Sequence, residues 1–221
     1  MGRRAVPRID PELDLARHLC HSDDLPPVCD SNTLFGNDLP WEIEVGCGKG
    51  LFLRNVATQV PGTNFLGVEV ARKYARTTAA RLAKADLTNA KIVHGDAREV
   101  FAQHIPSASV QAVHVYFPDP WWKKRHHRRR LLMPDFVEHI ERVLVPAGRL
   151  VLWTDVQEYF QLSCEVLANA SRLVGPHPIA ERHAEHSMDY HTHFERRMRL
   201  EGKPIYRGEF RKTSAGDRSM I

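Results

Sequence analysis

Short apolar runs alternate with amphipathic helical segments along most of the chain. Strand-like runs, bounded by turn residues, occupy residues 41–45, 64–70, 91–94, 110–117 and 149–154. Between and after them, apolar residues recur at helical spacing in residues 51–56, 71–83, 136–143 and 160–167. We therefore expect repeated strand-helix units along the chain.

This alternation predicts an α/β fold with a mostly parallel sheet and helices on both faces, connected through right-handed crossovers. The segment from Pro204 to Arg211 is compatible with an additional edge strand. Residues 1–38 mix charges, prolines and turn formers without a sustained period. We expect them to form a partly mobile arm, followed by one domain over residues 39–221.

The composition narrows the class of protein. A chain of 221 residues with 43% hydrophobic and 26% charged residues can bury one substantial core. The four cysteines form no C-x-x-C pair, and neither a secretory signal nor a long apolar run is present. We therefore expect a reduced, cytoplasmic setting, without a membrane span and without a bound metal. The net charge of +4 is small, so attraction to an anionic partner must come from local patches.

The residues directly after each strand carry the candidate chemistry, because ligands of open α/β sheets bind outside the carboxyl ends of the strands. After the first strand, Glu44 is followed by Gly46, Gly48 and Gly50. Glycines permit close backbone approach to a ligand. Their spacing departs from the G-x-G-x-x-G fingerprint of dinucleotide sites, which argues against a nicotinamide oxidoreductase.

Acidic residues follow the later strands as well. Glu69 ends the second strand, about 20 residues beyond the glycine loop, where a carboxylate can accept hydrogen bonds from both hydroxyls of a ribose. The alternative for Glu69 is an exposed surface glutamate. Asp96 suits either an adenine amino group or the cap of the next helix. Because Asp119 and Asp155 follow the fourth and fifth strands, the acids recur at one rim of the predicted sheet.

The segment from Tyr116 to Arg130 combines one carboxylate with aromatic and cationic side chains. Asp119 lies between two prolines, which keep the residues before them out of helical geometry and favour a stiff extended turn. The following residues offer flat faces for a base and cations for phosphates: Trp121, Trp122, Lys123, Lys124, Arg125, Arg128, Arg129 and Arg130. The alternative is a solvated basic helix start with two core tryptophans.

Four motifs resemble the bacterial tRNA (guanine-N7-)-methyltransferases, the TrmB family. They are Glu-Val-Gly-Cys-Gly-Lys-Gly at 44–50, Phe-Pro-Asp-Pro-Trp at 117–121, Thr-Asp at 154–155 and Thr-His-Phe-Glu-Arg-Arg at 192–197. The resemblance spans residues 34–212 and implies a Rossmann-like enzyme that uses S-adenosylmethionine to methylate a guanine in the tRNA variable loop, at position 46. His193 and Cys47 depart from the family pattern, since lysine and phenylalanine respectively are common at these positions.

The resemblance also implies roles for single residues. The cofactor-binding residues would be Glu44, Gly46, Gly48, Glu69, Asp96 and Asp119. Substrate contacts would come from Lys123, Asp155, Thr192, His193, Phe194 and Glu195. Asp119 is the implied catalytic residue.

The chemistry of a guanine N7 agrees with this assignment. N7 carries a lone pair and no proton, so methyl transfer needs no strong base. Alignment of the reacting atoms can supply about 7 to 11 kcal/mol. We expect Asp119 to orient the base and to favour the positive charge that develops on it.

Two rival interpretations stay open at this point. Pro118-Asp119-Pro120-Trp121 loosely resembles the loop that amino-group methyltransferases use, although the consecutive prolines are missing. A noncatalytic RNA-binding protein could keep the same scaffold, but the acids near the centre of the site argue against it. The sequence does not decide between monomer and homodimer, nor whether Arg196, Arg197 and Arg199 follow tRNA phosphates or solvate a helix face.

Overall fold

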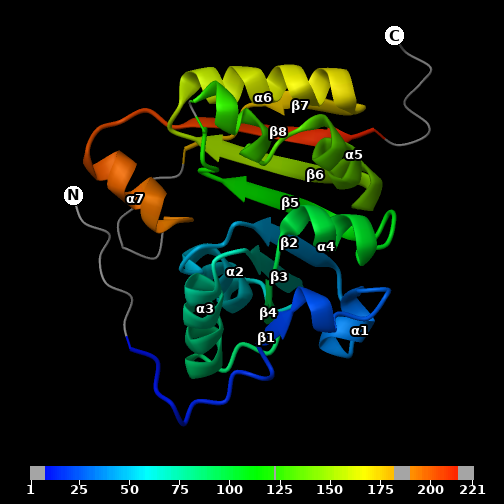
Figure 1. The fold of residues 1–221 in the computed structure, drawn as a ribbon, viewed down its shortest axis with the longest axis vertical. Coiled ribbons are helices and arrows are strands. Elements are labelled where there is room, and N and C mark those ends of the chain that lie inside the picture. The colour runs from blue at the N-terminus through cyan, green and yellow to red at the C-terminus, as the bar shows by residue number, and fades with distance from the viewer. Residues whose placement is uncertain (1–7, 122, 182–189, 214–221) are drawn as a thin grey trace.

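The computed structural model describes residues 8–121, 123–181 and 190–213. In this part of the chain, one eight-stranded sheet has the strand order β1-β4-β3-β2-β5-β6-β8-β7 (Figure 1). The strands are β1 (Leu19–His21), β2 (Trp41–Val45), β3 (Asn64–Glu69), β4 (Ala90–His94), β5 (Val110–Tyr116), β6 (Leu144–Thr154), β7 (Leu173–His177) and β8 (Tyr206–Lys212). All neighbours from β1 to β6 pair in parallel, whereas β8 is antiparallel to both β6 and β7.

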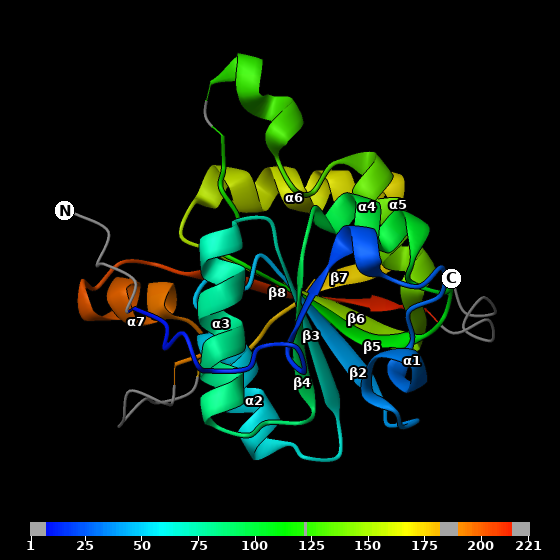
Figure 2. The same ribbon diagram turned by 60° about the horizontal axis from the view of Figure 1, so that its bottom comes forward.

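Helices cover both faces of the sheet (Figures 1 and 2). The helices are α1 (Ser31–Phe35), α2 (Leu51–Gln59), α3 (Arg72–Lys84), α4 (Ala97–Gln103), α5 (Pro134–Val143), α6 (Gln157–Ala170) and α7 (His193–Leu200), with 3-10 turns η1 (Ser22–Asp24) and η2 (Lys124–Arg129). α2 and α3 pack on β3 and β4, while α5 and α6 pack together over β6. The predicted α/β fold with a mostly parallel sheet is confirmed.

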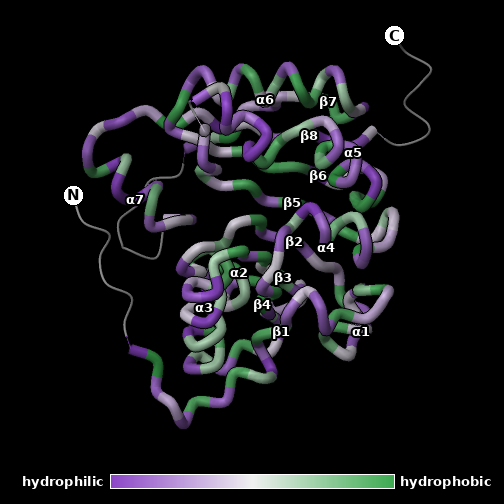
Figure 3. Tube along the Cα trace, viewed as in Figure 1, coloured by the Kyte–Doolittle hydropathy of each residue, from purple (hydrophilic) through white to green (hydrophobic). Residues whose placement is uncertain are grey.

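The central strands are buried on both faces, as near-continuous apolar runs predict. All residues of β3 are buried, and its alternating side chains enter two separate clusters. Leu66 joins Phe101 and Phe136 under α4 and α5, whereas Phe65 joins Leu53 under α2. In Figure 3, hydrophobic and hydrophilic residues alternate along the turns of α6, as expected for a helix with one face on the sheet. The apolar period of the sequence therefore identifies the inner faces correctly.

Part of the predicted N-terminal arm belongs to the folded domain. β1 extends the sheet by pairing with β4, and α1 starts at a capping box in which Asp30 and Thr33 exchange hydrogen bonds. Cys29 and Leu34 are buried in the main core. The turn-rich composition concealed these elements because each is shorter than the window in which periodicity can be recognised. Residues 1–7 lie outside the described part of the chain.

The five predicted central strands are confirmed, with two differences at the far side of the sheet. β6 starts at Leu144, before the turn at 146–148, and its pairing with β5 shifts register between Val110 and Ala112. The strand expected at the edge, β8, lies instead between β6 and β7. β7 was missed because only Leu173 of its residues is buried, so it carries little apolar signal. None of the described helices combines the length and the apolar character needed to cross a bilayer.

A substitution of Leu34 tests whether the segment before β2 belongs to the core. Leu34→Ala should lower the free energy of unfolding by about 2 to 4 kcal/mol, because it leaves a cavity beside α1. Leu200→Ala is the matched control, since Leu200 is 70% exposed and its substitution should change the value by less than about 0.5 kcal/mol. Chemical denaturation gives both values. Equal effects of the two substitutions would contradict the placement of α1.

Candidate active site

The strand order reverses next to β2, because β3 lies on one side of it and β5 on the other. Such a switch point opens a crevice at the carboxyl ends of parallel strands. A cavity of about 450 Å³ lies there. It is lined by Glu44, Gly46, Cys47, Gly48, Lys49, Gly50, Leu51, Phe52, Tyr74, Tyr116, Phe117, Asp119, Thr192, His193, Phe194 and Arg197. We call it the main cavity.

The glycine loop between β2 and α2 forms one wall of the main cavity in left-handed backbone conformations. Gly48 has a φ of 55° and Gly50 a φ of 67°, angles that side chains rarely tolerate. A Cβ atom at Gly50 would also collide with the Thr78 side chain. The Thr78 hydroxyl donates to the Gly48 carbonyl over 3.0 Å, which ties the loop to α3. Glycine is therefore required here by conformation and by space.

Glu44 is a buried carboxylate that borders the main cavity. Its Oε2 atom has no hydrogen-bond partner among the described residues. Burial raises the pKa of the Glu44 carboxyl to about 8, and the nearby charge of Glu69 adds to the shift. A buried, unpartnered acceptor is expensive to keep, so it fits a ligand that brings a donor or a positive charge to this wall.

Glu69 is not the exposed surface glutamate of the alternative interpretation. It is only 7% exposed, and its two oxygens accept hydrogen bonds from the amides of Gly48 and Ala71, each over 2.8 Å. The carboxylate thus joins the end of β3 to the glycine loop. Asp96, by contrast, is exposed and caps α4 by accepting from the Arg98 amide over 2.9 Å. The capping alternative for Asp96 is therefore present in the structure.

Asp119 lies on the wall of the main cavity and is exposed. Phe117, two residues earlier, has a φ of 51°. Its backbone is therefore left-handed, whereas the sequence predicts an extended conformation at this position. Such a strained conformation in a bulky residue persists only where its surroundings hold it. The Phe117 amide donates to the Trp153 carbonyl over 2.7 Å, and its ring lies 4.7 Å from that of Phe194.

The basic segment after Asp119 contains η2 and projects from the body of the domain, as the green turn at the top of Figure 2. It is fastened at its base, because Arg130 donates to the Pro120 carbonyl and Arg98 donates to the Arg130 carbonyl, each over 2.9 Å. Trp121 is partly exposed and lies under the Arg129 guanidinium. Trp121 is thus no core residue, and Trp122 lies outside the described residues. Lys123 is exposed at the start of η2.

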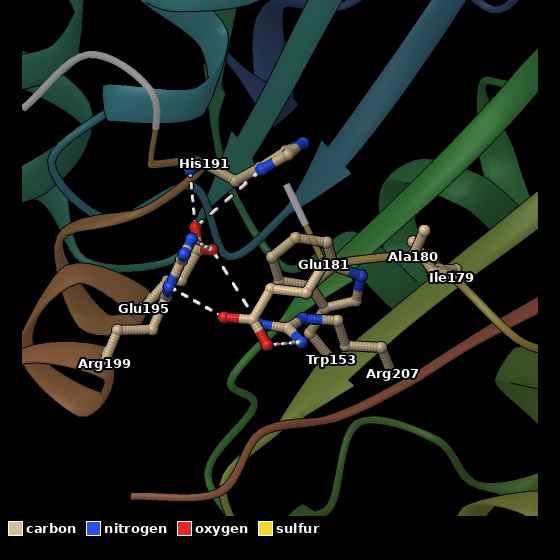
Figure 4. Close-up of a pocket in the computed structure, with 8 residues that line it drawn as sticks. All are labelled: Trp153, Ile179, Ala180, Glu181, His191, Glu195, Arg199 and Arg207. Atoms are coloured by element: carbon tan, nitrogen blue, oxygen red, sulfur yellow. Dashed lines mark hydrogen bonds and ion pairs between the residues drawn. The ribbon is translucent and has the colours of Figure 1, made fainter. Parts of the chain in front are cut away.

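The Thr-His-Phe-Glu motif divides between two cavities. Thr192, His193 and Phe194 line the main cavity. Glu195 lines a second, smaller cavity of about 100 Å³, shown in Figure 4. The Thr192 hydroxyl accepts from the Glu195 amide over 2.9 Å and so caps α7, which explains the threonine by local structure alone.

The side chain of Glu195 is almost completely buried in an ion-pair network (Figure 4). Its Oε2 accepts from the His191 amide over 2.6 Å, and its Oε1 lies 3.3 Å from Arg199 and 3.9 Å from Arg207. Glu181 bridges the same two arginines. Burial raises the pKa of the Glu195 carboxyl, although the His191 amide and the arginines oppose the shift. In this arrangement Glu195 fixes the start of α7.

Two other expected site residues do not line either cavity. Lys123 lies on the basic segment, and Asp155 follows β6 in a partly exposed position. The sequence reasoning missed Tyr116 and Tyr74, which line the main cavity. The Tyr116 hydroxyl lies 3.0 Å from Nδ1 of His114, two residues earlier on β5, where the alternation of side chains along a strand puts both on one face.

A chain of polar contacts continues behind Tyr116 into the sheet. Nε2 of His114 lies 2.7 Å from Glu42, whose other oxygen accepts from Arg149 over 2.8 Å. Burial opposes ionisation of Glu42, yet His114 and Arg149 lower the pKa of its carboxyl overall. Among the described residues, no group of three or more histidine, cysteine or acidic side chains is arranged to hold a metal ion.

The strand order, the antiparallel β8 and the glycine loop define a Rossmann-like methyltransferase fold, and comparisons with solved structures agree. The aminoglycoside resistance methyltransferase NpmB1 is 18% identical, with a TM-score of 0.55 over 79% of this chain and 87% of that one. Precorrin-6y C5,15-methyltransferase from Geobacter metallireducens GS-15 is 16% identical, with a TM-score of 0.50 over 62% of this chain and 65% of that one. At these identities the likeness concerns the fold alone.

Sequence relatives define the family more closely. A family model described as "Putative methyltransferase" matches residues 38–208. A tRNA (guanine-N(7)-)-methyltransferase of Rhodopirellula baltica is 49% identical over 97% of this chain and 81% of its own length. A protein of the same name from Geobacter metallireducens is 33% identical over 88% of this chain and 92% of its own length. The chain belongs to the tRNA (guanine-N7-)-methyltransferase family.

The raised pKa of Glu44 predicts a pH-dependent stability. Because the folded-state pKa of about 8 lies above the unfolded value of about 4.3, the folded state keeps a proton that the unfolded state releases between these pH values. The free energy of unfolding of the ligand-free protein should therefore fall as the pH rises from 5 to 8, by on the order of a few kcal/mol relative to Glu44→Gln. Denaturation at several pH values measures it. Glu138→Gln, at an exposed position on α5, is the control and should follow the wild type.

Substitution of Thr192 separates a capping role from a substrate contact. Thr192→Ala should lower the free energy of unfolding by about 1 kcal/mol in the absence of RNA, because α7 loses its cap. Thr192→Ser keeps a hydroxyl acceptor and should restore most of this loss. Denaturation of the free protein tests both variants. An unchanged stability of Thr192→Ala would contradict the capping role and leave only a contact with the substrate.

Proposed function

We propose that this protein transfers a methyl group from S-adenosylmethionine to N7 of a guanine in the tRNA variable loop, at position 46. The observation that carries the proposal is the meeting of two different carboxylates in one cavity. Glu44 is buried in its wall and Asp119 is exposed at its surface. The names of the relatives supply the tRNA and the guanine.

The residues around the main cavity fit a cationic cofactor. When bound, S-adenosylmethionine supplies a methyl group activated by a positively charged sulfur. Glu44 offers an unpartnered acceptor, whose raised pKa such a charge would lower again. Gly46 and Gly48 expose their backbone on the cavity wall, and Glu69 holds the loop in place. Asp96 would bind the cofactor from the start of α4, through the carboxylate oxygen that does not accept from the Arg98 amide.

Asp119 orients the guanine and does not remove a proton from N7, which carries none. Its carboxylate can accept hydrogen bonds from N1 and the exocyclic amine of guanine, and it favours the positive charge that the methylated ring acquires. The left-handed Phe117 and the flanking prolines hold this acid without a flexible linker. Phe117 and Phe194 offer apolar surface beside it for the base.

The remaining expected substrate contacts surround this centre. Thr192, His193 and Phe194 line the main cavity at the start of α7, and Lys123 begins the basic segment. Asp155 is proposed to contact the substrate from the end of β6. For Glu195 we propose a positioning role, because a direct contact with RNA would require its carboxylate to leave the network with Arg199 and Arg207.

The proposal is tested by incubating the protein with labelled S-adenosylmethionine and unmodified tRNA, followed by nucleoside analysis and site-selective cleavage at N7-methylguanosine. We expect label at a variable-loop guanine. Asp119→Asn should lower kcat by about 10²-fold while tRNA affinity changes little, because an amide can accept only one of the two hydrogen bonds and carries no charge. Asp135→Asn, an exposed acid at the start of α5, is the matched control.

Three outcomes would contradict parts of this proposal. Full turnover of Asp119→Asn with unchanged tRNA affinity would remove the role of Asp119. Methyl groups on an exocyclic nitrogen would favour the amino-group methyltransferase alternative. Cofactor binding without transfer to any RNA would favour a noncatalytic RNA-binding protein.

A further inference from the structure

The three arginines of α7 divide into an inner and an outer group. Arg199 is 18% exposed and pairs with Glu181 and Glu195 in the small cavity. Arg196 and Arg197 are exposed, and neither forms an ion pair with a carboxylate in the described part of the chain. Arg199 therefore has a structural role, whereas the outer pair calls for a different explanation.

Cations from three other elements gather beside this outer pair. Arg81 of α3 donates to the Lys49 carbonyl over 2.6 Å and lies 3.3 Å from Nε2 of His193. A guanidinium can only donate, so Nε2 of His193 must accept and the imidazole is neutral. Partial burial lowers the pKa of His193, and nearby positive charges lower it further: Arg81, Lys49, Arg54 and Arg196. Positive charges from three segments besides α7 therefore act on this imidazole.

We call the set Lys49, Arg54, Arg81, Arg196 and Arg197 the basic rim. Its members come from the glycine loop, α2, α3 and α7, and two of them, Lys49 and Arg197, line the main cavity. Arg197 also lies 4.3 Å from the Phe194 ring centre, at the cavity wall. Figure 2 shows α7 and η2 as separate projections from the body of the domain, so the rim and the basic segment are two distinct surfaces.

A solvated helix face does not account for this arrangement. Solvation alone requires charges spread over one helix, whereas here cations of four segments act on the His193 imidazole. Burial of Arg81 lowers its pKa, and the charge of Arg54 lowers it further, so these two cations are close enough to repel each other. A phosphate would offset that repulsion, and arginine can bind a phosphate through two parallel hydrogen bonds.

We propose that the basic rim binds phosphates of the tRNA strand next to the target guanine, on a surface separate from the basic segment. This inference rests on the proposed function, since it assumes that RNA reaches the main cavity. A strand held on both sides of the cavity would present one base to Asp119 without requiring contacts to neighbouring bases. Recognition by the rim would then depend on backbone charge and shape and not on sequence.

The double variant Arg196→Gln/Arg197→Gln tests the rim, with tRNA binding measured at several salt concentrations. Loss of two phosphate contacts should reduce the slope of log Kd against log salt by about 1.4 to 1.8 and weaken binding at low salt at least tenfold. Arg196→Lys/Arg197→Lys keeps the charges and should keep the slope. Arg172→Gln/Arg211→Gln removes two exposed arginines, Arg172 just before β7 and Arg211 on β8 opposite Arg149 of β6, and should leave the slope unchanged.

The outcomes separate this inference from the proposed function. An unchanged slope in Arg196→Gln/Arg197→Gln, with N7-methylguanosine still formed, would overturn the rim and leave the function intact. A fall in affinity without a change in slope would also overturn it, because phosphate contacts release counterions. Absence of N7-methylguanosine with the wild-type protein would instead overturn the function. Thermal denaturation, measured alongside, shows that the variants remain folded.

Discussion

The hydrogen bond between Glu69 and the Gly48 amide is the interaction on which the site depends. It joins the end of β3 to the loop after β2, and the other oxygen of Glu69 holds the chain as it turns into α3. The loop can take this shape only because Gly48 and Gly50 adopt left-handed conformations and because Gly50 leaves room for the Thr78 side chain. Two hydrogen bonds to one carboxylate thus set the shape of one cavity wall.

A second acid, Glu44, lies near the charge of Glu69 in an unfavourable position. Glu44 is buried near the charge of Glu69, and no described residue partners its Oε2 atom. The chain therefore stores an electrostatic penalty in the wall of the main cavity, a frequent property of binding sites. Burial raises the pKa of Cys47 as well, and the two carboxylates add to the shift. The Cys47 thiol therefore stays protonated and fills space in the cavity wall.

Charge is sorted by location around the cavity. Acids occupy the strand ends, while cations lie outside them, on η2 and on the basic rim. The network of Glu195, Arg199 and Arg207 separates the two tasks of α7, because it anchors one face of the helix and leaves the other to the cavity and the rim. This division explains how adjacent arginines in one short helix serve different purposes.

The sequence by itself determined the α/β class, the central strands and the acids at their ends, because burial on both faces leaves long apolar runs and the chain turns at glycine and proline. It also indicated Asp119 and the basic segment, since these lie within one continuous stretch. The sequence did not predict β1 and β7, because short or exposed strands are stabilised by pairing with their neighbours and not by their own composition.

Only the tertiary structure decided which side chains meet. It placed the Glu195 side chain in the smaller cavity, made Asp96 a helix cap, and brought Arg81 beside His193 from 112 positions earlier in the chain. Local periodicity carries no information on such long-range contacts, because they depend on the order of strands in the sheet and on the direction in which each helix crosses it.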